Sequence, residues 1–145
     1  MRHRAERIGR LRIAGFSLTE LMTVVVIVGI LSSIAIPNYR RYMLRTHRTA
    51  AKTALLAIAT SQERYYLEFH TYGTISQLDL RGYPTTSENA LYTITMETAD
   101  AVTYTAKATA AVGTNGVDMT KDTQCSWFQI TAAGTRTASG GTECW

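Results

Sequence analysis

The chain has 145 residues, of which 46% are hydrophobic, and its formal net charge is +4, so it is long enough for one small domain. Residues 1–15 carry five arginines and one glutamate, whereas the remaining ten Lys/Arg and ten Asp/Glu cancel. The basic balance therefore belongs to the N-terminal segment and gives little support to a nucleic-acid-binding domain.

A continuous apolar segment follows this basic stretch. It runs from Phe16 to Ile36, which as a helix is about 31 Å long at ~1.5 Å per residue. That length matches the ~30 Å hydrocarbon core of a bilayer and predicts a membrane-spanning helix. Two other interpretations are open: a secretory signal cut near Ser32–Ala35, and a plain membrane anchor held by its cytoplasmic arginines.

Neither of those interpretations explains Glu20, a carboxylate inside the apolar segment. A charge there costs roughly 2.5–3.5 kcal/mol and usually has a partner and a function. A cut between Gly15 and Phe16 would create an α-amino group four residues before Glu20. That amine could meet Glu20 in its own helix or in a neighbouring subunit.

The sequence Gly15-Phe16-Ser17-Leu18-Thr19-Glu20-Leu21, followed by the apolar run, resembles the class III leader of type IV pilins and type II secretion pseudopilins. The resemblance implies that a membrane prepilin peptidase removes residues 1–15 and N-methylates Phe16, and that Glu20 acts in assembly. It implies a single pass through the inner membrane with a periplasmic domain. The subunit would then enter a helical filament of pilins at the assembly platform and become part of an extracellular pilus.

Gly29 and Pro37 lie within or just after the apolar run. Both are poor helix residues, by about 1 and 3 kcal/mol relative to Ala, so they bracket a segment that could kink or melt. The resemblance implies that residues 29–37 lose helicity in the filament, and a simple kink is the alternative. Many pilins carry a further proline about 20 residues on, but the chain has none near Ala57.

After Pro37, an amphipathic pattern predicts that the helix continues over residues 38–70. The apolar stripe at spacings of three and four consists of Ala51, Ala54, Leu55, Ile58, Gln62, Tyr65, Tyr66 and Phe69. We place the charged residues Arg48, Lys52 and Glu63 away from the centre of this stripe. The stripe is typical of a helix that packs on a sheet.

The rest of the chain is expected to form a connecting loop over residues 71–90 and a sheet over residues 91–145. Alternation with a period of two predicts half-buried strands, joined by a hairpin turn at Thr98–Ala101. The four expected strands cover residues 92–97, 102–110, 125–131 and 135–138. The predicted fold class is therefore α+β: the type IV pilin fold, with a long N-terminal helix packed on a four-stranded antiparallel sheet.

Two cysteines, Cys125 and Cys144, lie near the C-terminus. If the leader directs export, they can form a disulfide in an oxidising compartment, whereas in a reducing one they would be free thiols. Closing this loop would stabilise the domain by roughly 3 kcal/mol. The short C-terminal loop is similar to the D-region of pilins, and the ending Cys144-Trp145 resembles minor pilins of the PilE/ComP kind.

No catalytic or metal-binding constellation is recognisable in the sequence, so neither an enzyme nor a cofactor is expected. The histidines His3, His47 and His70 lack metal-ligand spacing. Asp118 and Asp122 could bind calcium, although a solvated turn is the simpler interpretation.

The predicted function is a structural subunit, a minor pilin, of a type IV pilus that supports pilus biogenesis, twitching motility, adhesion or DNA uptake. A type II secretion pseudopilin is the first alternative. The second is a pilus-borne DNA receptor, which needs a basic stripe for which Lys107, Lys121 and Arg136 are available.

Overall fold

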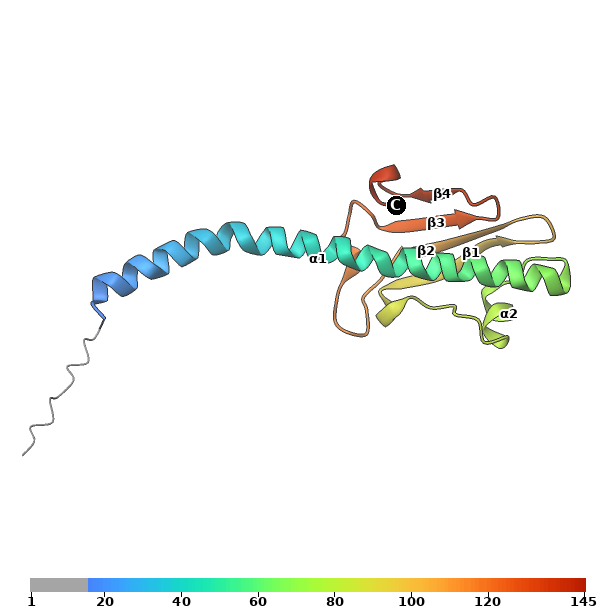
Figure 1. Cartoon of the computed structure of the whole chain (residues 1–145), viewed down its shortest axis with the longest axis horizontal. Helices are drawn as coiled ribbons and strands as arrows, with labels where there is room; N and C mark the ends of the chain where they lie inside the picture. The colour runs from blue at the N-terminus through green and yellow to red at the C-terminus, as the bar shows by residue number, and fades with distance from the viewer. Residues whose placement is uncertain (1–15) are drawn as a thin grey trace, which may run out of the picture. The chain divides into compact units, whose positions relative to one another are not determined.

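The computed structural model describes residues 16–145 (Figure 1). Gly15 and the rest of the basic leader lie outside the described residues, so the cleavage site stays a prediction. The described chain divides between Tyr39 and Arg40 into two compact units. The first is the beginning of a long helix, and the second is a helix-and-sheet domain.

Helix α1 spans Leu18–Phe69 without interruption. Its first half is exposed, and its second half buries the stripe predicted from the sequence, including Ala51, Leu55 and Ile58. Phe69 departs from the prediction, because the residue is 38% exposed and its ring lies beneath the guanidinium of Arg81 at 4.4 Å. The stripe therefore leaves the core in the last turn of α1.

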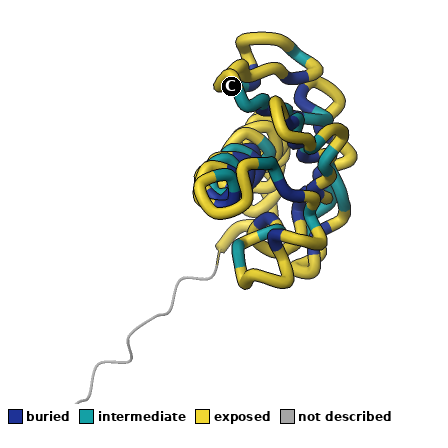
Figure 2. Tube along the Cα trace, turned by 90° about the vertical axis from the view of Figure 1, so that its right-hand side faces the viewer, coloured by how far each residue is buried: buried dark blue, intermediate teal, exposed yellow. Residues whose placement is uncertain are grey.

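The sheet has four antiparallel strands in the order β1-β2-β3-β4, which confirms the predicted fold class. Their bounds are β1 Tyr92–Ala99, β2 Tyr104–Ala110, β3 Trp127–Thr131 and β4 Arg136–Ala138. The alternation of buried and exposed residues places Tyr92, Tyr104 and Phe128 in the core. Figure 2 shows the buried residues of α1 on its side toward the sheet.

The hairpin turn between β1 and β2 lies two residues later than predicted. β1 continues through Ala99, and the Asp100 carboxylate accepts the N–H groups of Val102 (2.7 Å) and Thr103 (2.8 Å). These hydrogen bonds move the turn to residues 100–103 and exclude Val102, which is 84% exposed, from β2. This side-chain cap sets the position of the turn, and the alternation of apolar and polar residues in the sequence does not predict it.

The segment predicted as an irregular connector contains a short helix, α2, at Ile75–Leu80. Thr74 and Gln77 form a capping box: the Thr74 Oγ1 accepts the N–H of Gln77, and the Gln77 Oε1 accepts the N–H of Thr74. Short 3-10 turns follow at Glu88–Ala90, Met119–Lys121 and Gly141–Glu143. The expectation of a wholly irregular loop was therefore wrong.

Candidate assembly segment and C-terminal ion-pair cluster

The N-terminal half of α1 exposes apolar side chains and has the length and composition to cross a membrane. Phe16 is 84% exposed, and the apolar residues from Leu18 to Ile36 are exposed on every face of the helix. A helix that is apolar all round buries itself in lipid or among other helices. Within the described residues, these apolar side chains are not buried by other parts of the chain.

Glu20 lies in the first turn of α1. The helix dipole favours a carboxylate at this end, because the first N–H groups carry partial positive charge. Within the described residues Glu20 forms no ion pair, and the salt bridges lie in the other unit of the chain. The role of Glu20 in assembly therefore stays a prediction.

Gly29 and Pro37 do not end the helix, since α1 continues through both. Pro37 has no N–H to donate to the carbonyl of Ser33, which loses its usual helical donor. The Ser33 hydroxyl makes a separate hydrogen bond, to the carbonyl of Ile30 at 2.7 Å. A side chain added at Gly29 would meet open space. Packing within the described chain does not explain the glycine, and the melting of residues 29–37 in a filament stays a prediction.

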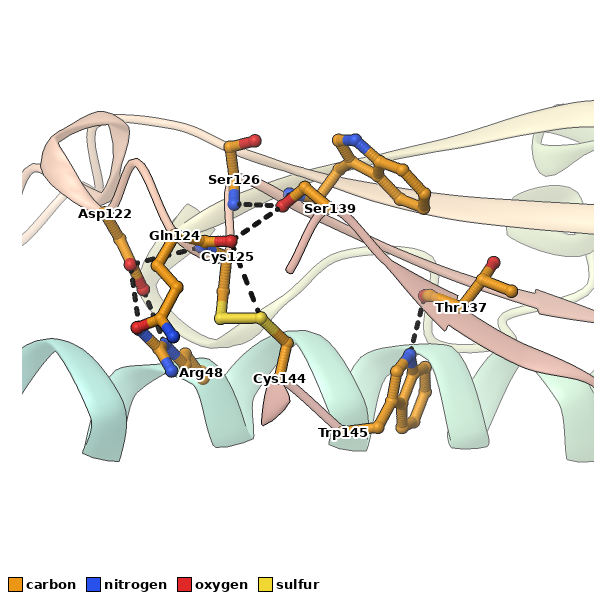
Figure 3. Close-up of a disulfide and its surroundings, with 10 residues drawn as sticks. Arg48, Asp122, Gln124, Cys125, Ser126, Thr137, Ser139, Cys144 and Trp145 are labelled. Atoms are coloured by element: carbon orange, nitrogen blue, oxygen red, sulfur yellow. Dashed lines mark hydrogen bonds and ion pairs between the residues drawn. A yellow bond between two sulfur atoms is a disulfide. The ribbon is translucent and has the colours of Figure 1, made fainter. Parts of the chain in front are cut away.

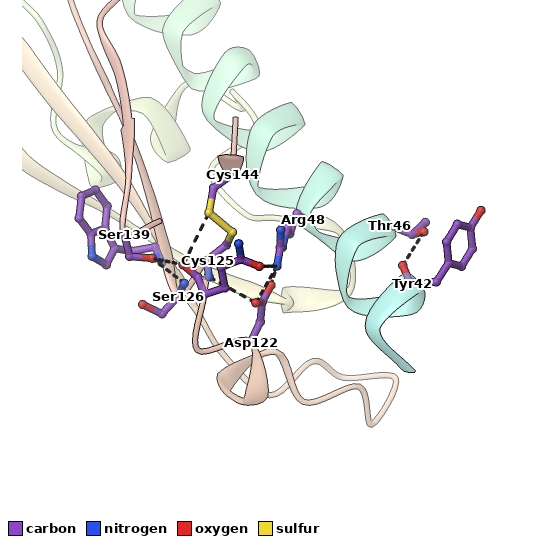
Figure 4. Close-up of polar contacts among 10 residues, drawn as sticks. Tyr42, Thr46, Arg48, Asp122, Cys125, Ser126, Ser139 and Cys144 are labelled. Carbon is purple, nitrogen blue, oxygen red and sulfur yellow. Dashed lines mark hydrogen bonds and ion pairs between the residues drawn. A yellow bond between two sulfur atoms is a disulfide. The ribbon is translucent and has the colours of Figure 1, made fainter. Parts of the chain in front are cut away.

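An ion pair that the sequence did not indicate links the second half of α1 to the loop before β3 (Figure 4). The Arg48 Nε and Nη2 donate to the Asp122 carboxylate at 2.6 and 2.9 Å. Arg48 is 8% exposed and Asp122 is 3% exposed. Two predictions were therefore wrong: Arg48 lies on the buried face of α1, and Asp122 is not in a solvated turn.

The disulfide between Cys125 and Cys144 lies beside this pair (Figure 3), as predicted for an oxidised chain. Both cysteines are buried, and the Cys125 N–H donates to Asp122 Oδ1 at 3.3 Å. Trp145 completes the region, because its Nε1 donates to the Thr137 carbonyl at 2.6 Å. Helix α1, the loop before β3 and the C-terminus are thus held together by one continuous set of contacts.

Tyr92 contributes a buried hydroxyl to the same neighbourhood. Burial, and next the negative charge of Asp122, raise the pKa of Tyr92. Within the described residues its hydroxyl has no hydrogen-bond partner. The phenol therefore stays protonated and serves the core through its ring, which meets Phe128 edge to face at a centroid distance of 5.7 Å.

The two aspartates considered for calcium serve different purposes. Asp122 binds Arg48, whereas Asp118 caps the turn at Met119–Lys121. The hydroxyl of Thr120, followed by Lys121, lowers the pKa of Asp118. Across residues 16–145 no group of three or more His, Cys, Asp or Glu side chains is arranged to hold a metal ion.

The three cations available for a DNA-binding stripe each lie beside an anion or a ring. Lys107 binds Glu97 at 2.9 Å and lies 5.2 Å from the ring centre of Trp127. Lys121 is 3.4 Å from Asp118. Arg136 lies over Trp145 at 5.5 Å. In the described residues Lys107 and Lys121 are paired with carboxylates and Arg136 lies over an aromatic ring, so these cations form no continuous basic stripe.

Comparison with known proteins places this geometry in a family. Residues 37–129 match the family described as "Type IV minor pilin ComP, DNA uptake sequence receptor". Residues 10–36 match the prokaryotic N-terminal methylation motif. The two matches meet at Pro37, where the apolar segment ends. The similarity thus covers both the assembly segment and most of the folded domain.

Individual relatives agree with the family match. The chain is 30% identical over 138 residues to the type IV major fimbrial protein FimA of Dichelobacter nodosus, covering 78% of this chain and 84% of FimA. It is 47% identical over 58 residues to the type IV major pilin protein PilA of Myxococcus xanthus, covering 40% of this chain and 26% of PilA. With the type II secretion system core protein G of Escherichia coli it shares 33% identity over 63 residues, 43% of each protein.

Among solved structures, the chain is similar to the non-core minor pilin PilV of Neisseria meningitidis, with 25% identity and a TM-score of 0.48 over 70% of this chain and 91% of that one. The chain spans only about a quarter of PilA, but most of FimA. From the family match and the FimA alignment, we conclude that this chain is a type IV pilin that belongs to the ComP minor pilin family.

Proposed function

We propose that this chain is a structural subunit, a minor pilin, of a type IV pilus. The observation that carries the proposal is the exposed apolar half of α1 with its single carboxylate, Glu20, attached to a folded domain. Before assembly, this segment crosses the inner membrane and the domain lies in the periplasm. During assembly, the same segment packs among the helices of other pilins at the assembly platform.

Maturation prepares the segment for that exchange. A prepilin peptidase cuts after Gly15 and N-methylates Phe16, because only a residue without a side chain fits at the cut. The new amine supplies a cation for Glu20, either in the same helix or in the neighbouring subunit of the filament. A buried carboxylate paired in this way no longer carries the cost of an isolated charge in an apolar setting.

The test is to follow a tagged chain into filaments. Wild-type chain should appear at mature size in sheared pili, whereas Gly15→Leu should stay in the membrane as full-length precursor. Val28→Leu, a conservative change inside the apolar run, is the matched control and should behave as wild type. Mature chain that never enters sheared pili would refute the proposal.

A type II secretion pseudopilin is the second candidate, and the similarity to core protein G supports it. The two candidates differ in where the chain is found. A pilin enters long surface filaments, whereas a pseudopilin is needed for release of secreted proteins. Deletion of the gene should therefore reduce piliation or pilus-dependent functions, such as twitching motility, adhesion or DNA uptake, and leave secretion intact.

A DNA receptor is the third candidate, supported by the description of the family as a DNA uptake sequence receptor. The sheet places Lys107 beside Trp127 on its outer face, which combines a cation with an aromatic ring. Affinity for double-stranded DNA that falls steeply with salt, and falls again in Lys107→Ala, would favour this candidate. Binding that is equal in wild type and Lys107→Ala would count against this site.

A further inference from the structure

We propose that a group of side chains just after the apolar run of α1 binds the headgroups of anionic phospholipids before the chain enters a filament. This group, the juxtamembrane cluster, consists of Tyr39, Arg40, Arg41, Tyr42 and Arg45. The inference rests on the proposed function, because it requires α1 to cross the inner membrane. It adds the class of lipid that holds the chain there and the residues that bind this lipid.

The three arginines of the cluster have no anionic partner within residues 16–145. Arg40, Arg41 and Arg45 are exposed, and the salt bridges of the described residues involve other side chains. The sequence contains no Asp or Glu between Glu20 and Glu63, so α1 supplies no carboxylate one or two turns away. The counter-ion of these arginines must therefore come from another molecule or from the solvent.

The two tyrosines of the cluster are also exposed. Tyr39 is 64% exposed and Tyr42 is 66% exposed, and Figure 4 shows the Tyr42 ring pointing away from the buried ion pair near the disulfide. A tyrosine joins an apolar ring to a polar hydroxyl, and for this reason tyrosines are enriched where a membrane meets water. Arginine suits the same depth, because its stem is apolar and its charged end reaches the polar layer.

The position of the cluster along the helix matches the headgroup layer of a bilayer. Arg40 and Arg41 follow Ile36, the last residue of the apolar run, by about 6 and 7.5 Å along a helix. With the hydrocarbon core ending at Ile36, the headgroups occupy about the next 5–7 Å. Side chains of an α-helix lean toward its N-terminus, which here is the direction of the membrane. Arg45, one turn beyond Arg41, therefore leans back toward the same layer.

The arrangement around the helix favours a lipid surface over a protein partner. Successive residues of an α-helix are about 100° apart, so the four exposed residues 39–42 point to all sides of α1. A protein that packs on a helix covers one face, as the sheet covers the stripe through Leu55. A membrane surrounds the helix on every side. The positive charge of the cluster selects headgroups with net negative charge among those that the membrane offers.

Removal of the leader makes this contact important. Residues 16–39 contain no Lys or Arg, so in a chain that begins at Phe16 the cluster supplies the basic residues nearest to the apolar run. In the proposed topology these residues lie on the periplasmic side. Anionic headgroups bound there hold the mature chain at a fixed depth, and the contact is released when the chain moves into the filament.

The experiment places a photoreactive side chain inside the cluster. The full chain carrying Tyr42→benzoylphenylalanine is inserted into vesicles of equal parts phosphatidylglycerol and phosphatidylcholine, irradiated, and analysed by mass spectrometry. Adducts with phosphatidylglycerol should exceed those with phosphatidylcholine several-fold, because the first lipid is anionic and the second has no net charge. Position 42 reports on lipids at its own end of the apolar run, so the arginines of the leader do not dominate the ratio.

Charge variants in the same background test the arginines. Arg40→Gln/Arg41→Gln/Arg45→Gln should bring the ratio of the two adducts close to one. Arg64→Gln/Arg81→Gln/Lys121→Gln is the matched control, because it removes the same number of exposed charges elsewhere in the chain and should leave the ratio unchanged. An equal fall in both variants would show that the ratio follows net charge alone and would overturn the proposal.

The remaining outcomes separate this proposal from the proposed function. A chain that inserts into the vesicles but gives equal adducts with the two lipids would refute the lipid contact and leave the pilin function standing. A chain that does not insert would contradict both. In isolated inner membranes, position 42 should again give mainly lipid adducts. A protein adduct as the main product would assign the cluster to a protein partner and overturn the proposal.

Discussion

The two halves of α1 belong to one unbroken helix but differ in what surrounds them. From Leu18 to Tyr39 the apolar side chains are exposed, whereas from Arg40 onward the helix buries one stripe against the sheet. The second half finds its partner within the chain, as an amphipathic helix should. The first half has no such cover within the described residues, and a helix that is apolar all round buries itself in lipid or among other helices. The comparison therefore separates residues that build the fold from residues that serve assembly.

Glu20 gives the largest expected effect. Glu20→Val should leave membrane insertion intact because it removes a costly charge, and cleavage should continue because the cut is four residues away. Entry into filaments should be lost, since the partner of the new amine is gone. Tagged variants probed in membranes and in sheared pili give the measurement. Normal incorporation of Glu20→Val into filaments would show that Glu20 is not needed for assembly. A block in cleavage would show instead that the peptidase recognises Glu20.

The buried ion pair should give the largest effect on the stability of the folded domain. Asp122→Ala leaves the Arg48 guanidinium without its anion in a buried setting, which should cost about 3–5 kcal/mol. The exposed pair of Arg81 and Glu68 is the control, and Glu68→Ala should cost at most about 1 kcal/mol. Urea unfolding of the mature chain in detergent measures both. Equal costs would show that burial does not set the strength of the pair.

Two leucines, one in each half of α1, differ in burial. Leu55 is fully buried and Leu31 is 62% exposed. Leu55→Ala should lower the free energy of unfolding by about 2–5 kcal/mol, because it leaves a cavity. Leu31→Ala should leave the unfolding of the domain unchanged and act, if at all, on assembly. A clear loss of domain stability in Leu31→Ala would mean that the first half of α1 is covered within the chain.

The disulfide gives the smallest of these effects. Cys144→Ser should lower the free energy of unfolding by about 3 kcal/mol, as expected for a loop of 19 residues. The loss should equal that of wild type treated with a reductant. Alkylation of denatured, unreduced wild-type protein should label neither Cys125 nor Cys144. Labelling of both would show that the exported chain is not oxidised.

Much of this architecture could be predicted because its signals are local. The 21-residue apolar run, the stripe through Leu55 and the alternation of β1 and β2 each follow from a short periodic pattern. Helix α2 also had a local signal, the capping box of Thr74 and Gln77, but the glycines and proline around it favoured a loop. Extending the stripe backward from Ala51 by three residues would have placed Arg48 on the buried face.

Other features had no such signal. Asp122 is 74 residues from Arg48 in sequence, and nothing within the polar loop around Asp122 distinguishes it from Asp118. The two edges of the sheet are likewise visible only once the strand order is known. Sequence periodicity predicts which face of a helix or strand is buried. It does not predict which charged residues pair across a long sequence separation, because that depends on the whole fold.

Assembly through α1 is tested by the intact mass and N-terminal sequence of the chain recovered from sheared filaments. We expect a polypeptide that begins at Phe16, carries one added methyl group on its α-amine and keeps the Cys125–Cys144 disulfide. A chain that begins after Ala35 would lack the whole assembly segment. That result would identify residues 1–35 as an ordinary signal peptide and contradict assembly through α1.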